Sequence, residues 1–429
     1  MPHATVDVAY GGVMERVMND KVRKLIDRGV AIPHPASVDI GDEVDPVLIA
    51  PESTIYAGCK IFGKKTVIMS GTRLGQEAPV TIEDCQIGRD VELKGGYFKK
   101  SVFLEKSNMA CGAHVRDACI LEEEAGGAHT VGLKQTILMP FVTLGSLINF
   151  CDCLMAGGTS RKDHSEVGSS YIHFNYTPNQ DKATASLLGD VPRGVMLDQR
   201  PIFLGGQGGI VGPASLGFGT VIAAGTVLRG DVVEDGTIVM GQALKEGRQE
   251  FVPGVYWEIK RKIRNNIAYI ANIGALKAWY THVRALFFGP DQLEQALLSG
   301  ALEKLDMALD ERIKRLGAVA AKMDHSVRAY QRCMGSAASS VLVRQKQELA
   351  DSWDNIEGAL AKLRDVQGDI AGRDTFLSAL AESRHTQSRD YISTIQGLPE
   401  DLRTAGTQWL TSIVDEITAA CLGRLPTFQ

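Results

Sequence analysis

Apolar residues recur at every sixth position through much of the first 250 residues, as in Ile49, Ile55, Ile61 and Val67. An α-helix needs a period near 3.6 and an ordinary strand a period of two, so a sustained period of six implies short strands that turn a corner after each hexad. Three such faces make one triangular coil, with one aliphatic residue per hexad inside. The pattern predicts a left-handed parallel β-helix of hexapeptide repeats over about residues 41–252. The same period returns in Leu204, Ile210, Leu216, Ile222 and Leu228.

Helical spacing flanks this solenoid on both sides. Within residues 1–40, the stretch GVMERVMNDKVRKLIDRG is typical of a short amphipathic linker helix that ends at Gly29. After about residue 253 the apolar steps become three and four, which predicts an α-helical bundle or coiled-coil domain over 253–429. Because the stripes approximate heptads, pairing between subunits is an alternative to packing within one chain. The stripe that shows this best is Leu298, Leu302, Leu305, Leu309, Ile313 and Leu316.

A long polar stretch interrupts the hexads between about residues 157 and 201. Loops expelled from a regular solenoid commonly carry its binding function, and this one is rich in His, Asn, Tyr, Lys and Arg. A tolerated surface insertion is the alternative. We expect the loop from His164 to Arg200 to wall off a ligand groove against coils that contain 205–209 and 223–225.

Composition narrows the classes of function. A net charge of −5 on 429 residues gives no broad attraction to nucleic acid or anionic lipid. The N-terminus lacks an apolar signal core, and no run of eighteen apolar residues occurs, so we expect a cytoplasmic protein with no membrane span. Of the eight cysteines, Cys151 and Cys153 are the nearest pair; their spacing of two favours buried thiols on one strand face over a metal site, and no metal is predicted.

Three segments together resemble a known family. They are FLGGQGGIVGPASLGFGTVIAAGTVLRGDV at 203–232, LIDRGVAIPHPASVDIGDEVDPVLIAPESTIYAGCKIFG near the N-terminus, and the pair Asn175-Tyr176. They resemble the acetyltransferase domain of the bifunctional N-acetylglucosamine-1-phosphate uridyltransferase/glucosamine-1-phosphate acetyltransferase family, within the hexapeptide-repeat transferases, over about residues 15–250. The resemblance implies a trimeric enzyme of UDP-N-acetylglucosamine metabolism that transfers an acyl group from acetyl-CoA or another acyl-CoA to an amino sugar, sugar phosphate or nucleotide sugar.

The resemblance also implies roles for particular residues. Asn175 and Tyr176 match the sugar-contacting pair, and Gly206 and Ala224 match positions whose amides bind the pantetheine arm of the cofactor. The hexad itself also demands small residues at such positions, so Gly206 and Ala224 have two explanations of equal weight.

The departures from the family are equally informative. No Gly-x-Gly-Thr-Arg-Met nucleotide loop precedes residue 40, so we expect no pyrophosphorylase activity. In the family, the base is a histidine about two dozen residues before the Asn-Tyr pair. This chain has no histidine there; the region holds Asp152 between two cysteines. His164 and His173 are the substitutes we consider, because a neutral histidine is the usual general base, although loop histidines are more often plain surface residues. Lys182, Arg193 and Arg200 suit a phosphate or diphosphate, or are ordinary exposed cations.

Two functions of different class follow. The first is an acyltransferase; the second is a binding or regulatory protein that keeps the sugar-nucleotide groove without the chemistry and recruits a protein partner through its helical domain. The missing upstream histidine favours the second, and the polar loop with the intact final coils favours the first. A purely structural scaffold explains the polar loop poorly.

We expect a homotrimer about an axis parallel to the solenoid, because a triangular prism offers flat faces and the final coils carry small residues that permit close approach. Sedimentation equilibrium at micromolar concentration should give three times the chain mass of 46.4 kDa. A monomer under these conditions would contradict the prediction.

Overall fold

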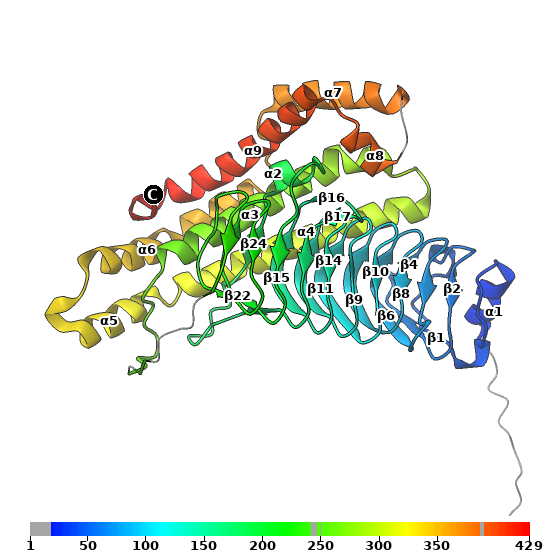
Figure 1. Cartoon of the computed structure of the whole chain (residues 1–429), viewed down its shortest axis with the longest axis horizontal. Coiled ribbons are helices and arrows are strands. Elements are labelled where there is room, and N and C mark those ends of the chain that lie inside the picture. The colour runs from blue at the N-terminus through cyan, green and yellow to red at the C-terminus, as the bar shows by residue number, and fades with distance from the viewer. Residues whose placement is uncertain (1–18, 242–246, 249, 387–389) are drawn as a thin grey trace, which may run out of the picture.

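The computed structural model describes residues 19–241, 247–248, 250–386 and 390–429. It is a parallel β-solenoid followed by a helical region, as the sequence predicts (Figure 1). The long helices run beside the coils along one side of the solenoid, and the short helix α1 (Asp20–Asp27) stands at the opposite end from the last coils. The helix predicted ahead of the solenoid is thus present from Asp20 onward, and its predicted first part lies outside the described residues.

Each coil has three faces, which we call faces 1, 2 and 3 in the order that the chain follows. Strands of one face pair in parallel with the strand one coil earlier, so the sheet runs along the solenoid axis. The predicted inward residues Ile49, Ile55, Ile61 and Val67 are at most 1% exposed, which confirms the hexad reading. Face 1 contains β2 (Thr54–Ile55), β5 (Arg73–Leu74), β8 (Glu92–Leu93), β10 (Asn108–Met109), β12 (Gly126–Gly127), β14 (Thr143–Leu144), β18 (Glu166–Val167), β21 (Phe203–Leu204), β24 (Val221–Ile222) and β26 (Ile238–Val239).

Faces 2 and 3 share four long strands that bend at the corner between them. These are β9 (Gly96–Phe103), β11 (Ala113–Leu121), β13 (Gly132–Leu138) and β15 (Asn149–Met155). Face 2 continues with β1 (Asp39–Ile40), β3 (Lys60–Phe62), β6 (Val80–Glu83), β19 (Ile172–Phe174), β22 (Gly209–Val211) and β25 (Val227–Leu228). Face 3 continues with β4 (Val67–Ile68), β7 (Gln86–Ile87), β20 (Ser186–Leu188) and β23 (Ser215–Leu216).

The bend between faces 2 and 3 uses a left-handed backbone conformation. Lys100, Gln135 and Asp152 have φ angles of 46°, 53° and 59°. Such angles are uncommon for residues other than glycine, so this corner is held by the pairing on either side of it. The corner matters below because Asp152 lies in it.

Residues 157–201 differ from the single inserted loop that we expected. They contribute β18, β19 and β20 to all three faces, and the chain leaves the coils only at corners. One excursion, 175–185, lies between faces 2 and 3. The others lie between faces 3 and 1: the hairpin of β16 (Gly158–Ser160) with β17 (Asp163–His164), and 189–202 with α2 (Val191–Gly194). The sequence did not reveal these strands, because each is only two or three residues long and the segment around them is polar.

The helical region folds against the solenoid of its own chain. α4 contacts β4, β7, β9 and β11, and α3 contacts β20, so the helices cover face 3, and among the described residues none of α3 to α9 packs broadly on face 1 or face 2. This supports packing within one chain, one of the two readings of the heptad-like stripes. The helices are α3 (Lys260–His282), α4 (Gln292–Ala320), α5 (Met323–Met334), α6 (Ser340–Lys362), α7 (Ile370–Thr386), α8 (Tyr391–Gln396) and α9 (Glu400–Leu422).

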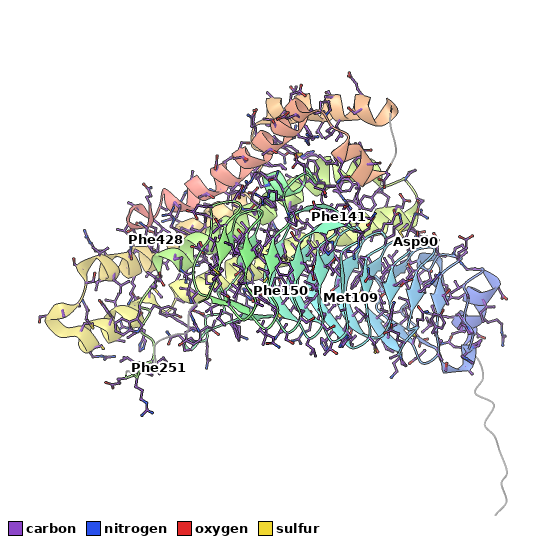
Figure 2. The ribbon with its side chains drawn as sticks, in the orientation of Figure 1. Asp90, Met109, Phe141, Phe150, Phe251 and Phe428 are labelled. Carbon is purple, nitrogen blue, oxygen red and sulfur yellow. The ribbon has the colours of Figure 1, made fainter. Side chains whose placement is uncertain are left out.

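One hydrophobic core runs through both parts. Met109 and Phe150 lie within the coils and Phe428 lies among the last helices, and all three belong to the same buried cluster (Figure 2). Burying this apolar surface is the main force that holds the helices on face 3. Within the described ranges, no helix has the length and apolar character that a bilayer-spanning segment needs.

A group of buried charges stands where helices and coils meet. Arg284, 1% exposed, pairs with Glu123 of the solenoid and lies 3.8 Å from the ring centre of Tyr391. Next to this pair, the hydroxyl of Tyr280 donates to Oε1 of Glu122 at 2.6 Å. Burial raises the pKa of Glu122 to about 7, although Arg284 lowers it.

This shift predicts a pH dependence of stability. The folded chain holds a proton on Glu122 that the unfolded chain releases near its ordinary pKa of about 4.3, so the stabilisation is present at low pH and is lost as pH rises toward 7. We expect the wild type to lose more unfolding free energy between pH 5 and pH 8 than Glu122→Gln does, by on the order of 1–3 kcal/mol. Urea unfolding at both pH values measures the difference. Equal losses in the two proteins would contradict the assignment.

Candidate functional site

The Asn-Tyr pair lies at the corner between faces 2 and 3. Asn149 of β15 pairs with Ile172 of β19, which sets Asn175 directly over Asp152 of the coil before it. The Asn175 side chain bonds on both sides: its Nδ2 donates to Oδ2 of Asp152 at 3.3 Å, and its Oδ1 accepts from the hydroxyl of Thr184 at 2.8 Å. The amide of Asn175 is therefore held in one orientation.

Asp152 is held in turn by the helical region. Nη2 of Arg312, on α4, donates to Oδ1 of Asp152 at 2.7 Å, and both residues are buried, at 2% and 8% exposed. Burial raises the pKa of Asp152, and the charge of Arg312 opposes the shift. A carboxylate in such a place needs a cation beside it to remain ionised.

The excursion that starts at Asn175 is anchored at further points. Lys262 of α3 pairs with Asp181, which is 1% exposed, at 2.7 Å. The side chain of Asn179 bonds to the backbone at Gly254 and Val255, in the segment that leads into the helices. Residues 175–185, which we call the Asn175 loop, thus lie between the last coils and the helical region.

His173 is buried inside the prism, although its side chain interacts with that of Asn175, which opposes the effect of burial on its pKa, and it lies within reach of the charge of Arg312. It occupies the inward position of its strand, where neighbouring coils place Phe150 and Ile210, and it is 3% exposed. Its ring centre is 6.2 Å from that of Phe150, and its Nε2 is 2.8 Å from the hydroxyl of Ser186. Burial lowers the pKa of His173 to about 4, so the imidazole is neutral at pH 7. A spacing of two residues would place His173 and Asn175 on the same face of a strand, but β19 ends before Asn175.

An uncovered apolar strip adjoins the Asn175 loop on face 2. Ile172, Phe174 and Val227 are 37%, 38% and 41% exposed, and Tyr176 at the edge is 65% exposed. Gly209 is required beneath Phe174, because a Cβ there would meet the phenyl ring at 2.3 Å. Flat apolar surface bordered by polar groups is typical of a binding or interaction surface.

The proposed cofactor residues lie at the other edge of face 2. The corner between faces 1 and 2 holds Gly206 and, one coil later, Ala224, which is exposed. The coils approach closely here: a Cβ on Gly205 would be 2.3 Å from the backbone nitrogen of Ala224. Face 2 therefore lies between the residues that the resemblance assigns to the cofactor and those that it assigns to the sugar.

The remaining predicted residues lie elsewhere, except Lys182, which is exposed on the Asn175 loop. His164, Arg193 and Arg200 lie at the corner between faces 3 and 1. Nδ1 of His164 is 2.9 Å from the carbonyl oxygen of Arg161. Arg193 pairs with Asp190 at 2.7 Å and Asp235 at 2.5 Å, which already neutralise it. A single chain thus does not gather all the predicted residues around one groove, and their roles remain predictions.

Arg312, Thr184 and the bonding role of Asp152 escaped the sequence reasoning. The resemblance did point to the region of Asp152, as the place of a missing base. Arg312 is 160 residues away in the chain and lies on a stripe that core packing explains, so no local signal marks it. Burial raises the pKa of Cys151, beside Asp152, to about 11, and the described residues contain no group of three or more His, Cys, Asp or Glu suited to a metal ion.

Comparisons with known proteins agree with the resemblance. The chain is 25% identical over 218 residues to the bifunctional protein GlmU of Thermotoga maritima, and 26% identical over 216 residues to that of Pelobacter propionicus. Each match covers 50% of this chain but only 43% and 42% of the relative, so the chain corresponds to less than half of these proteins. Similarity and fold together relate the chain to hexapeptide-repeat transferases. No family model matches.

A solved structure of UDP-N-acetylglucosamine acyltransferase from Campylobacter jejuni is also similar, at 14% identity, with 48% of this chain and 67% of that chain covered. The TM-score is 0.20, and at this level the superposition carries no argument.

The burial of His173 predicts its titration. We expect NMR of the imidazole to show a neutral ring from pH 8 down to pH 5, because the pKa is about 4, with the resonance assigned by its loss in His173→Gln. The unfolded chain binds a proton near pH 6.5 that the folded chain rejects, so this group's contribution to stability is lost as pH falls from about 6.5 toward 4. A titration midpoint near 6.5 would show that the ring is exposed to solvent.

Proposed function

We propose that this chain transfers an acyl group from an acyl-CoA to an amino sugar, sugar phosphate or nucleotide sugar. The observation that carries the proposal is the course of face 2, which runs uncovered from Gly206 and Ala224 at one edge to Asn175 and Tyr176 at the other. A strand of three residues spans about 10 Å. The two groups of residues that the resemblance assigns to donor and acceptor are thus separated by the width of one face.

The chemistry requires an acceptor that is oriented and a group that takes its proton. The fixed amide of Asn175 and the exposed hydroxyl of Tyr176 supply hydrogen-bonding groups for a sugar at the corner. Asp152 stands 23 residues before Asn175, at the place where the resemblance puts the base, and directly beneath that amide. His173 acts from inside the prism only through groups that it contacts, namely Ser186 and the side chain of Asn175.

A second copy of the chain completes such a site. In the part of the chain that the structure describes, faces 1 and 2 of the last coils carry exposed apolar residues, and face 1 exposes Phe203 by 41% and Ile238 by 62%. In a homotrimer the corner that bears His164 and Arg200 of one protomer could meet face 2 of the next, which would unite residues that one protomer keeps apart. With an acyl-CoA as donor, we expect the reaction to take place in the cytoplasm.

A second candidate is a sugar-nucleotide binding protein without catalysis. It is favoured by the burial of His173 and by the ion pair that occupies Asp152. In this case the helical region would present a surface to a protein partner while the corner still binds the sugar.

Release of free thiol from acetyl-CoA tests the first proposal, with glucosamine 1-phosphate, glucosamine and UDP-N-acetylglucosamine as acceptors. We expect release with at least one of them. A general base contributes roughly 10²- to 10⁴-fold, so the variant among His164→Ala, His173→Gln and Asp152→Asn that removes it should lower kcat by that factor and leave binding nearly unchanged. Asn175→Ala should instead raise KM.

Thermal unfolding with the same compounds separates the two candidates. A ligand at a hundred times its dissociation constant stabilises the folded chain by about 2.7 kcal/mol. Stabilisation that Asn175→Ala abolishes, without thiol release, would select the binding protein. Neither thiol release nor stabilisation with any of these compounds would contradict both candidates.

A further inference from the structure

The helical region contacts the Asn175 loop and its corner at several separate points. Arg312 of α4 bonds to Asp152, Lys262 of α3 bonds to Asp181, and Nζ of Lys322 donates to the carbonyl oxygen of Asn179. All three are cations of the helical region that meet an oxygen at the corner between faces 2 and 3. The last coils therefore do not determine the conformation of this loop alone.

One of these contacts continues into the proposed site. Arg312 bonds one oxygen of Asp152, the other oxygen of Asp152 accepts from Asn175, and Asn175 accepts from Thr184 at the far end of the loop. Each bond fixes the group that makes the next one, because a carboxylate with both oxygens engaged cannot rotate freely. The orientation of the Asn175 amide thus depends on a residue 137 positions further along the chain.

The buried ion pair between Arg312 and Asp152 is not explained by packing alone. A buried ion pair of this kind is often no more stabilising than apolar residues of similar volume, because both charges lose their water. Arg312 also keeps Nε and Nη1 buried without a hydrogen-bond partner among the described atoms, which adds to the cost. An apolar residue on α4 would fill the same space, so what the arginine adds is a defined orientation of Asp152.

We propose that Arg312 is a positioning residue: through Asp152 it sets the orientation of Asn175 and the order of the loop 175–185, so that the helical region pre-organises the ligand-binding corner. This inference depends on the proposed function only for the identity of the ligand that the loop binds. Without the guanidinium, the Asp152 carboxylate is a buried charge with no cation beside it, which burial disfavours, so the carboxylate and the loop that it bonds move toward water.

The chain supplies a matched control. Arg284 is also a buried arginine of the helical region that pairs with a carboxylate of the solenoid, Glu123, and it is 1% exposed against 2% for Arg312. Its pair lies at the corner between faces 3 and 1 and makes no hydrogen bond to the Asn175 loop among the described residues. Arg284→Met should thus reproduce the loss of a buried ion pair without the loss of positioning.

Amide hydrogen exchange of the full-length chain tests the inference without a ligand. We compare peptides that cover 175–185 in the wild type, Arg312→Met, Arg284→Met and the double variant Arg312→Met/Asp152→Asn. We expect exchange in this loop to rise at least about tenfold in Arg312→Met and to change little in Arg284→Met. The double variant should return toward the wild-type rate, because a neutral amide at position 152 needs no cation and still bonds to Asn175.

Each other outcome overturns the inference. Equal rises in both arginine variants would mean that a buried pair anywhere on face 3 matters equally. An unchanged loop in Arg312→Met would mean that the coils order it without the helices. A rise that Asp152→Asn does not reverse would indicate a packing defect. Should Arg312→Met fail to fold, the single variant Asp152→Asn serves instead: it strands the buried guanidinium, so loop exchange should rise, and an unchanged loop contradicts the inference.

These results stay separate from the proposed function. The exchange pattern can hold even if no thiol is released and no sugar binds, in which case the loop is pre-organised for a different ligand. The opposite result is acyl transfer by the wild type while Arg312→Met changes neither the loop exchange nor KM. That result would support the proposed function and would show that Arg312 has no part in it.

Discussion

A six-residue repeat admits one side chain per face to the interior of the prism, and the properties of the site depend on which residues take that place. On face 2 the inward position passes through Phe150, His173 and Ile210 in successive coils. A histidine in this column has apolar residues in the adjacent coils, so it is buried and neutral at pH 7. The polar residues available to a ligand are instead those at corners, where the chain turns or leaves the coil. This is why Asn175, at a corner, is exposed whereas His173, two residues earlier, is buried, although their side chains interact.

The helical region then makes the three faces unequal. The helices pack on face 3, whereas faces 1 and 2 have no such layer among the described residues. The corner between faces 2 and 3 gains a second wall from α3 and α4, whereas the corner between faces 1 and 2 remains open at Gly206 and Ala224. Excursions from the coils occur at the two corners that border the covered face, where the helices supply partners for their polar groups.

Much of this arrangement could be predicted from the sequence, and the limits have physical causes. The hexads of Ile49 to Val67 and the stripe of α4 are local patterns, so both elements were predicted correctly. The strands of residues 157–201 were missed because two or three residues carry too little periodicity. The bond from Arg312 to Asp152 joins positions 160 apart and depends on how α4 lies on face 3, which no local pattern encodes. Asn175 was recognised only because the pair that it forms with Tyr176 resembles a known motif.

The length of α4 has a consequence for how the chain comes apart. In a bare solenoid each coil touches only its neighbours, so the coils can fray one at a time from either end, and stability adds up as in a one-dimensional array. α4 has 29 residues, about 43 Å at the usual rise, which is enough to lie across about nine coils. α4 contacts β4 and β7, where the side chain of Gln86 lies against Gly300, and Arg312 of the same helix bonds to Asp152. Coils far apart in the array therefore share one partner, and melting any of them removes contacts from the same helix. The solenoid of this chain should consequently lose its structure as one cooperative unit, and the helix that makes it so also reaches the corner that bears Asn175.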